Sequence, residues 1–220
     1  MHDTARDEAK ARQGVIETAQ AMARAGLSPG TSGNVSCRWG DGILITPTGL
    51  PYDALRVEDV AYVGPDGAYD AAGRKPSSEW RFHLAAYRAR EDAAAVVHCH
   101  SLNATALACA HKPIPAFHYM VAVAGGSDIP LAPYATFGTG ELAAHVETTL
   151  RIRKACLMAN HGQIATGETL PAALDLALEV ETLAAQYIKV LEIGEPRLLS
   201  AAEMSRVLAR FAGYGQQPEE

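Results

Sequence analysis

The most constraining stretch of the sequence is an apolar run, Ala93–Val97, that ends in two histidines one residue apart, His98 and His100. Side chains of a β-strand alternate between its two faces, so a strand here would place His98 and His100 on one face and Cys99 on the other. Two imidazoles on one face suit a divalent metal, and a buried strand would hold them rigidly. The stretch therefore predicts a pair of metal ligands that other parts of the chain would have to complete.

Size and charge limit the function classes that need consideration. The 220 residues, 48% hydrophobic and 20% charged, are typical of one globular domain with a sizeable core. A formal net charge of −6 argues against nucleic acid or an acidic membrane surface as a partner. No apolar run approaches membrane-spanning length, and the polar N-terminal stretch lacks a signal-peptide core, so we expect a cytoplasmic protein.

Hydrophobic periodicity and turn residues predict helices and strands in mixed order. The expected helices cover residues 4–25, 77–87, 101–109, 140–152, 170–193 and 200–212, the second of them capped by Ser77 or Ser78. The expected strands cover residues 35–38, 43–46, 60–63, 96–101, 129–134 and 155–160, the first two as a hairpin. Because these elements follow no regular β-α-β order, we expect a single-domain α/β fold with a mixed, mainly antiparallel central sheet flanked by helices.

Two further polar side chains fall at the ends of expected elements and can complete the histidine pair. His161 follows the strand at 155–160, and Glu79 lies at the start of a helix. Three neutral imidazoles with one open position are typical of catalytic zinc sites, whereas structural zinc sites are closed by four protein ligands. Glu79 would be either a displaceable fourth ligand or the general base. The remaining candidates are interpreted as solvated or packed side chains: His2, His83, His111 and His145.

Three loops offer groups that bind anions. Gly33-Asn34, Thr48-Gly49 and Ser77-Ser78 each combine backbone N–H groups with small or hydroxyl side chains at a loop or at a helix start. Such groups bind a phosphate without a cationic side chain. Each loop alone is also an ordinary turn. Three of them beside one candidate metal site indicate a phosphate pocket.

Five segments carry a resemblance to a known family. They are Ser32-Gly33-Asn34-Val35-Ser36-x-Arg38, Leu44-Ile45-Thr46-Pro47-Thr48-Gly49-Leu50-Pro51-Tyr52, Pro76-Ser77-Ser78-Glu79-Trp80-Arg81-Phe82-His83, Val97-His98-x-His100 and His118-Tyr119-Met120. In this order they resemble the class II (metal-dependent) aldolase family, whose fold is shared by the adducin head. Together with further matching segments, the resemblance extends from Gly26 to Gly215.

The resemblance implies a metal centre and a substrate pocket. One zinc ion per subunit, or cobalt or manganese in its place, would be held by His98, His100, His161 and Glu79. The phosphate pocket would be formed by Gly33, Asn34, Thr48, Gly49, Ser77 and Ser78. Phe137 and Tyr214 would line the aldehyde end, Tyr214 from a mobile C-terminal tail, residues 214–220, of the single domain 1–220. Tyr119 would reach the site from a neighbouring subunit, which makes the implied assembly a cyclic homotetramer with active sites at subunit interfaces.

The implied activity is the reversible cleavage of a ketose 1-phosphate to dihydroxyacetone phosphate and a short aldehyde. L-Fuculose 1-phosphate and a 5-deoxy or 5-methylthio pentulose 1-phosphate from nucleoside salvage are the candidate substrates. Glu79 would move protons at carbon, and Tyr119 would donate a hydrogen bond or proton to the aldehyde oxygen in the synthetic direction. Asn160 stands where the best-matching branch of the family has a histidine, and no arginine follows Tyr214. Both departures concern the aldehyde end and leave the aldehyde open.

Two other functions compete with the aldolase. The first is a sister enzyme of the superfamily: a pentulose-phosphate 4-epimerase, a sugar-acid-phosphate decarboxylase or a methylthioribulose-phosphate dehydratase. The second is a non-catalytic assembly domain similar to the adducin head. The block around Glu79 together with Tyr119 favours the aldolase, and the presence of all three histidines argues against a purely structural domain.

Overall fold

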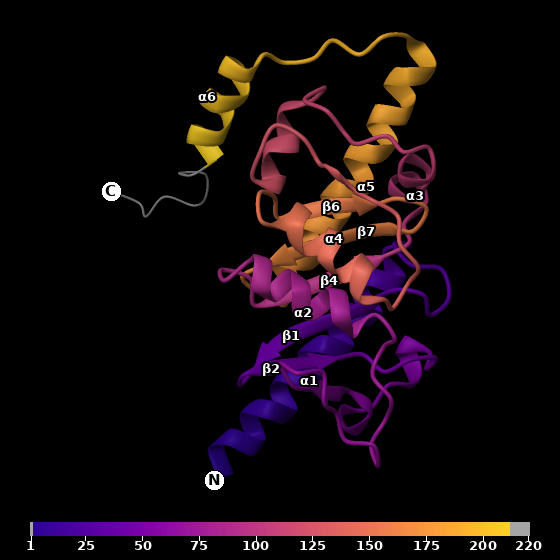
Figure 1. The fold of residues 1–220 in the computed structure, drawn as a ribbon, viewed down its shortest axis with the longest axis vertical. Coiled ribbons are helices and arrows are strands. Elements are labelled where there is room, and N and C mark those ends of the chain that lie inside the picture. Colours follow the sequence, from indigo (N-terminus) through magenta and orange to yellow (C-terminus); the bar gives the residue numbers. More distant parts are fainter. Residues whose placement is uncertain (1, 212–220) are drawn as a thin grey trace.

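Residues 2–211 are described by a computed structural model, in which one seven-stranded sheet carries helices on both faces (Figure 1). The strands are β1 Asn34–Trp39, β2 Gly42–Ile45, β3 Ala61–Val63, β4 Ala95–Cys99, β5 Leu131–Ala132, β6 Ala155–Met158 and β7 Gly162–Gly167. The α-helices are α1 His2–Arg24, α2 Trp80–Ala89, α3 Leu102–Cys109, α4 Gly140–Leu150, α5 Leu170–Ile193 and α6 Ala201–Phe211. Three short 3-10 helices are η1 Tyr52–Ala54, η2 Val57–Asp59 and η3 Tyr119–Ala124.

The strands follow the order β3-β2-β1-β4-β7-β6-β5 across the sheet. Neighbouring strands are antiparallel, except that β5 and β6 are parallel. The expected mixed, mainly antiparallel sheet, the β1–β2 hairpin and the edge position of β5 are therefore confirmed. The sequence did not predict β7. Its segment Gly162–Gly167 contains one large apolar residue, Ile164, and β7 is buried because it lies between β4 and β6.

The central strand β4 contributes to a different core on each face of the sheet, as its alternation predicts. Ala95, Val97 and Cys99 belong to the core that α1, α3 and α5 cover. Val96 belongs to the second core, under α2 and α4, and His98 projects toward the same side, where its ring packs edge-on against Phe82 at 5.0 Å between centroids. The histidine pair is thus fixed to the face of the sheet that α2 covers.

The C-terminal part of the described chain lies apart from the sheet. An extended segment, residues 194–200, leads from α5 to α6, which packs against η3 through the buried Met204 (Figure 1). The predicted mobile tail, residues 214–220, lies outside the described residues. Within residues 2–211 no helix is both long enough and apolar enough to span a membrane.

The end of β4 and the start of β7 approach so closely that only glycine fits between them. A Cβ atom on Gly162 would lie 2.5 Å from the Cys99 carbonyl oxygen and 2.9 Å from Cδ2 of His100. Either contact forces backbone or imidazole to move. The glycine therefore sets how closely the strand that carries His98 and the turn that carries His161 can lie.

We predict that Gly162→Ala lowers the free energy of unfolding by about 1–3 kcal/mol, because overpacking of a fitted contact costs that much. Gly140→Ala is the matched control, because a Cβ atom at Gly140 meets nothing within 4 Å and the residue opens α4. The control should be neutral or slightly stabilising. Denaturant midpoints of the two variants measure the difference, and equal midpoints would contradict the close approach.

Candidate active site

His98 and His100 emerge at the end of β4 with their rings on one side. His98 Nδ1 lies 2.8 Å from the carbonyl oxygen of Gln163 on the neighbouring strand β7, so Nδ1 carries the proton and donates it. The Nε2 lone pair of His98 is therefore left to face the site. His100 follows the strand directly, and its Nε2 lies 3.1 Å from Nε2 of His98. The expected same-face pair is present, and Cys99 lies in the opposite core.

His161 enters from the tight turn between β6 and β7. Asn160 before it has a φ of 52°, a left-handed conformation that asparagine tolerates better than most residues. The backbone N–H of Asn160 donates to the carbonyl oxygen of Ala108. The His111 ring donates from Nε2 to the side-chain oxygen Oδ1 of Asn160 at 2.6 Å. These bonds fix the turn, and with it the direction of the His161 side chain.

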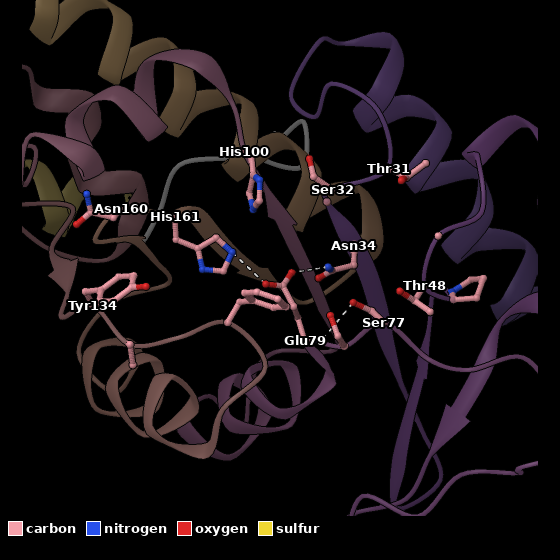
Figure 2. A pocket seen from close by; sticks show the side chains of 16 residues that line it. Thr31, Ser32, Asn34, Thr48, Ser77, Glu79, His100, Tyr134, Asn160 and His161 are labelled. Carbon is pink, nitrogen blue, oxygen red and sulfur yellow. Dashed lines mark hydrogen bonds and ion pairs between the residues drawn. The ribbon is translucent and has the colours of Figure 1, made fainter.

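Glu79 occupies the residue before the first turn of α2, where the sequence placed a serine cap. That expectation is wrong. Helix α2 begins at Trp80, and the capping position belongs to Glu79, whose side chain makes no capping hydrogen bond. Its carboxylate is turned toward the histidines instead, while its backbone N–H donates to Ser77 Oγ at 3.3 Å. Figure 2 shows the carboxylate between His161 and Asn34, with His100 pointing toward it.

The four side chains form one cluster whose potential ligand atoms all lie within 4.8 Å of one another. Glu79 Oε2 lies 3.2 Å from His98 Nε2, and Glu79 Oε1 lies 3.0 Å from His161 Nε2. A divalent ion held about 2.0–2.1 Å from each imidazole nitrogen would keep tetrahedral ligand atoms about 3.3 Å apart. The spacings observed here fit such an ion. Three nitrogens and one carboxylate are also a donor set that suits zinc and neighbouring divalent metals.

Burial and charge prepare these groups to bind a cation. Burial and the neighbouring histidines lower the pKa of His100 to about 4, so its ring is neutral at neutral pH. Burial by itself would raise the pKa of Glu79, but the adjacent His98 and His161 rings outweigh it and hold the carboxyl pKa well below its usual range. A neutral imidazole and an ionised carboxylate are the forms that coordinate metal.

The cluster lies in a pocket of about 330 Å³. The three loops that the sequence singled out line it, and no lysine or arginine is among the described residues of its wall. The lining residues are Thr31, Ser32, Gly33, Asn34, Pro47, Thr48, Gly49, Ser77, Ser78, Glu79, His100, Tyr134, Ala135, Phe137, Asn160 and His161. The expected phosphate-binding residues and the metal cluster therefore share one cavity (Figure 2).

Two of the backbone N–H groups expected to bind phosphate are used within the protein. Thr48 N–H donates to the carbonyl oxygen of Lys75, and Ser77 N–H donates to that of Thr46, both at 3.0 Å. These bonds hold the second and third loops together. The hydroxyl groups of Thr48 and Ser77 face the same pocket, and the Ser77 hydroxyl, which accepts from the Glu79 N–H, still has its own proton to donate. At these two positions the hydroxyl groups, and not the backbone N–H groups, are therefore left as donors for an anion.

The remaining expected residues are distributed differently. Phe137 lines the pocket with 65% of its surface exposed, and Tyr134, which sequence reasoning missed, lies at the same rim with 57% exposed. Because β5 is parallel to β6, the residues that follow both strands meet at one edge of the sheet, which brings Tyr134 to the pocket that His161 also lines. The sequence pattern does not reveal this pairing, so Tyr134 was missed. Tyr119 is 51% exposed and lines a different cavity, between η3 and α6. Tyr214 lies outside the described residues.

A helix-covered, mainly antiparallel sheet thus presents three histidines and a glutamate in one place with three hydroxyl-rich loops, an arrangement that suits metal-assisted chemistry on an anionic substrate. The family model described as Class II Aldolase and Adducin N-terminal domain matches residues 13–188. The chain belongs to this family, and the expected aldolase, a carbon–carbon lyase, is confirmed.

Named relatives cover nearly the whole chain. A protein of Rhodospirillum rubrum named 5-methylthioribulose-1-phosphate/5-deoxyribulose-1-phosphate aldolase is 52% identical over 208 residues, 94% of each chain. The L-fuculose phosphate aldolase of Escherichia coli (strain K12) is 51% identical over 211 residues, 96% of this chain and 97% of the relative. A solved structure of an L-fuculose 1-phosphate aldolase superposes with a TM-score of 0.88 at 36% identity, covering 92% of this chain and 96% of the other.

The cluster geometry predicts that His161→Ala loses most of its bound divalent metal, because one of three nitrogen ligands is removed. His145→Ala is the control: this histidine lies on α4, outside the cluster, and its ring bonds to the carbonyl oxygen of Pro133. Metal content per chain after loading with zinc and desalting should fall only in the first variant. A full complement in His161→Ala would remove His161 from the ligand set.

A second prediction concerns the stability of the metal-free protein. Burial lowers the pKa of His83 to about 3, and that of His100 falls to about 4, from an ordinary value of 6.5. The unfolded chain therefore binds more protons than the folded chain below about pH 6.5, so stability rises with pH across this window and is lost as pH falls. The urea midpoint should be lower at pH 5 than at pH 7; an unchanged or higher midpoint would contradict both buried neutral rings.

Proposed function

We propose that this protein is a zinc-dependent aldolase that cleaves a ketose 1-phosphate to dihydroxyacetone phosphate and a short aldehyde, with cobalt or manganese as possible substitutes for zinc. The single observation that carries the proposal is the common pocket of the Glu79–histidine cluster and the three hydroxyl-rich loops. A ketose 1-phosphate has its phosphate and its carbonyl group at adjacent carbons, and it would need an anion site and a cation site side by side.

The residues divide the reaction between them. The bound cation would supply Lewis-acid stabilisation of the negative charge that develops on oxygen during carbon–carbon cleavage. The hydroxyl groups of Thr48, Ser77 and Ser78 would orient the phosphate, so the phosphate would be bound by uncharged donors. Glu79 would accept and return the proton at the carbon atom that loses its bond to the aldehyde. No lysine lines this pocket among the described residues, so an imine route has no nucleophile there.

The names of the relatives support two substrate groups. Relatives of almost equal identity are named for L-fuculose phosphate and for 5-methylthioribulose and 5-deoxyribulose 1-phosphates. These sugar phosphates have the same phosphorylated end and differ in the aldehyde that cleavage would release. We propose the shared ketose 1-phosphate as the substrate class.

Tyr119 belongs to the proposal as a residue of a neighbouring subunit. It lies half exposed beside a cavity of about 740 Å³ that is separate from the cluster, so its own chain does not bring it to Glu79. A homotetramer with sites at subunit interfaces would bring a neighbour's Tyr119 to the aldehyde oxygen. There it would donate a proton in the synthetic direction and take that proton back in cleavage. We infer a cytoplasmic enzyme of carbohydrate metabolism or nucleoside salvage.

The experiment that tests the function measures release of dihydroxyacetone phosphate from fuculose 1-phosphate, ribulose 1-phosphate, 5-deoxyribulose 1-phosphate and 5-methylthioribulose 1-phosphate, with and without a chelator. We expect metal-dependent release from at least one of them, and the ranking of kcat/KM identifies the aldehyde. If none releases it, the epimerase, decarboxylase or dehydratase activities of the superfamily become the better assignment.

We predict that Glu79→Gln lowers kcat by about 100-fold or more, because an amide cannot take the proton that a carboxylate takes. Glu192→Gln is the control, since Glu192 is an exposed residue of α5 paired with Lys189 at 2.8 Å. Metal content is measured on both variants to separate loss of the base from loss of the cation. Near-normal turnover in a metal-loaded Glu79→Gln protein would exclude Glu79 as the base.

A further inference from the structure

A chain of buried hydrogen bonds leads away from Glu79 between α2 and β1. Asn34 Nδ2 lies 2.8 Å from Glu79 Oε2, and Asn34 Oδ1 lies 2.5 Å from His83 Nε2. His83 Nδ1 lies 2.7 Å from Ser36 Oγ, which lies 2.9 Å from the Tyr87 hydroxyl. His83 and Ser36 are fully buried, and the other three are nearly so. The mechanism proposed above uses only the first member of this chain.

This chain of hydrogen bonds can form because the residue spacing along the strand nearly equals that along the helix. Asn34 and Ser36 are two residues apart on β1, about 6.6–6.8 Å along the strand. Glu79, His83 and Tyr87 follow one another at intervals of four residues, about 6 Å along a helix axis. The two rows therefore interleave along their length. Asn34 also pairs with His98 in the sheet, so the chain is anchored to the strand that carries the histidine pair.

The donors in this chain have one consistent direction. Glu79 is a carboxylate that can only accept, so Asn34 must present its NH2 group to Glu79 and its carbonyl oxygen to His83. That oxygen needs a donor, which places the proton of the His83 ring on Nε2. Nδ1 then accepts from the Ser36 hydroxyl, whose oxygen accepts from Tyr87. Burial lowers the pKa of His83 to about 3, which keeps the ring neutral, as this direction requires.

The reverse direction would set two acceptors against each other. If the His83 proton were on Nδ1, Asn34 would have to rotate its NH2 group toward His83 Nε2. Its carbonyl oxygen would then face the Glu79 carboxylate at about hydrogen-bond distance, with no proton between them. Buried acceptors left without a donor cost about 1–3 kcal/mol each, more for a charged group. The orientation of Asn34, and through it that of Glu79, thus depends on which nitrogen of His83 carries the proton.

We propose that His83 is a positioning residue for the aldolase reaction, which fixes the Asn34 amide and thereby holds the Glu79 carboxylate in the orientation needed to take the substrate proton. The inference rests on the proposed function of Glu79 as the base. His83 does not line the substrate pocket itself. Its ring nitrogens bond to Asn34 and Ser36 and to no residue of the cluster, so it acts through Asn34, which does line the pocket.

Two substitutions at His83 separate the two halves of the ring. His83→Gln can still donate an N–H to Asn34 from the position of Nε2, whereas His83→Asn retains an acceptor near Ser36 but cannot reach Asn34. We expect kcat to fall by about 10–100-fold in His83→Asn, a range typical of outer-shell partners, with KM nearly unchanged. His83→Gln should recover most of that loss. Tyr87→Phe removes only the outermost bond and should lose less than His83→Asn.

Each variant is compared at equal metal content and equal folded fraction, so that a purely structural role is recognised. A purely structural role predicts that, at equal folded fraction, His83→Gln and His83→Asn have the same kcat. That result, or a KM increase without a fall in kcat, would overturn the inference. Recovery specific to glutamine supports it.

A second measurement is independent of turnover. Nitrogen NMR of the zinc-loaded protein with labelled histidine reports which ring nitrogen of His83 carries a proton, with His83→Gln used to assign the signal. We expect a neutral ring protonated at Nε2 at pH 7. A ring protonated at Nδ1, or a doubly protonated ring, would overturn the inference even if the enzyme is active. If no ketose 1-phosphate is cleaved, the proposed function fails. The NMR measurement still decides the donor direction of the hydrogen bonds between Glu79 and Tyr87.

Discussion

The contact of the Glu79 carboxylate with two imidazoles is the interaction on which the surrounding structure depends. It joins the start of α2 to the ends of β4 and β6, and a third partner, Asn34, comes from β1. Bringing imidazole lone pairs and a carboxylate together out of water is unfavourable unless a cation lies between them. The two apolar cores on either face of the sheet hold this arrangement in place at the end of β4, the middle strand of the sheet.

Local pattern was enough to predict the parts of the site that depend on one element each. The alternation of β4 is a property of any strand, so the shared face of His98 and His100 and the opposite direction of Cys99 could be predicted. The same applies to the glycine- and hydroxyl-rich loops, because their composition alone makes them candidates. Most helices and strands were also predicted, since their apolar periodicity reflects which face is buried.

The features that were missed depend on contacts between elements. Strand β7 is short of large apolar residues and becomes a central strand only because β4 and β6 pair with it. Ser77 and Thr48 looked like anion donors, but the N–H group of each satisfies a carbonyl oxygen of the other loop. His83 was interpreted as a packed side chain, which is true of its burial. Its hydrogen bonds connect residues 34–36 with residues 79–87. No pattern in the sequence shows that these two segments meet, because they come together only when β1 and α2 pack against each other.

The two ends of the pocket are built differently, and this difference bears on which part of the substrate a single chain can recognise. The ends that we propose for the metal and the phosphate consist of buried side chains and of loops tied to one another by backbone hydrogen bonds. At the end that we propose for the aldehyde, Tyr134 and Phe137 leave more than half of their surface uncovered by the described chain. Burying exposed aromatic side chains at a pocket rim is favourable, so such side chains mark a surface that a substrate or another protein surface can cover. Selection among aldehydes would therefore depend on what covers this rim, whereas recognition of the shared phosphorylated half depends on buried geometry.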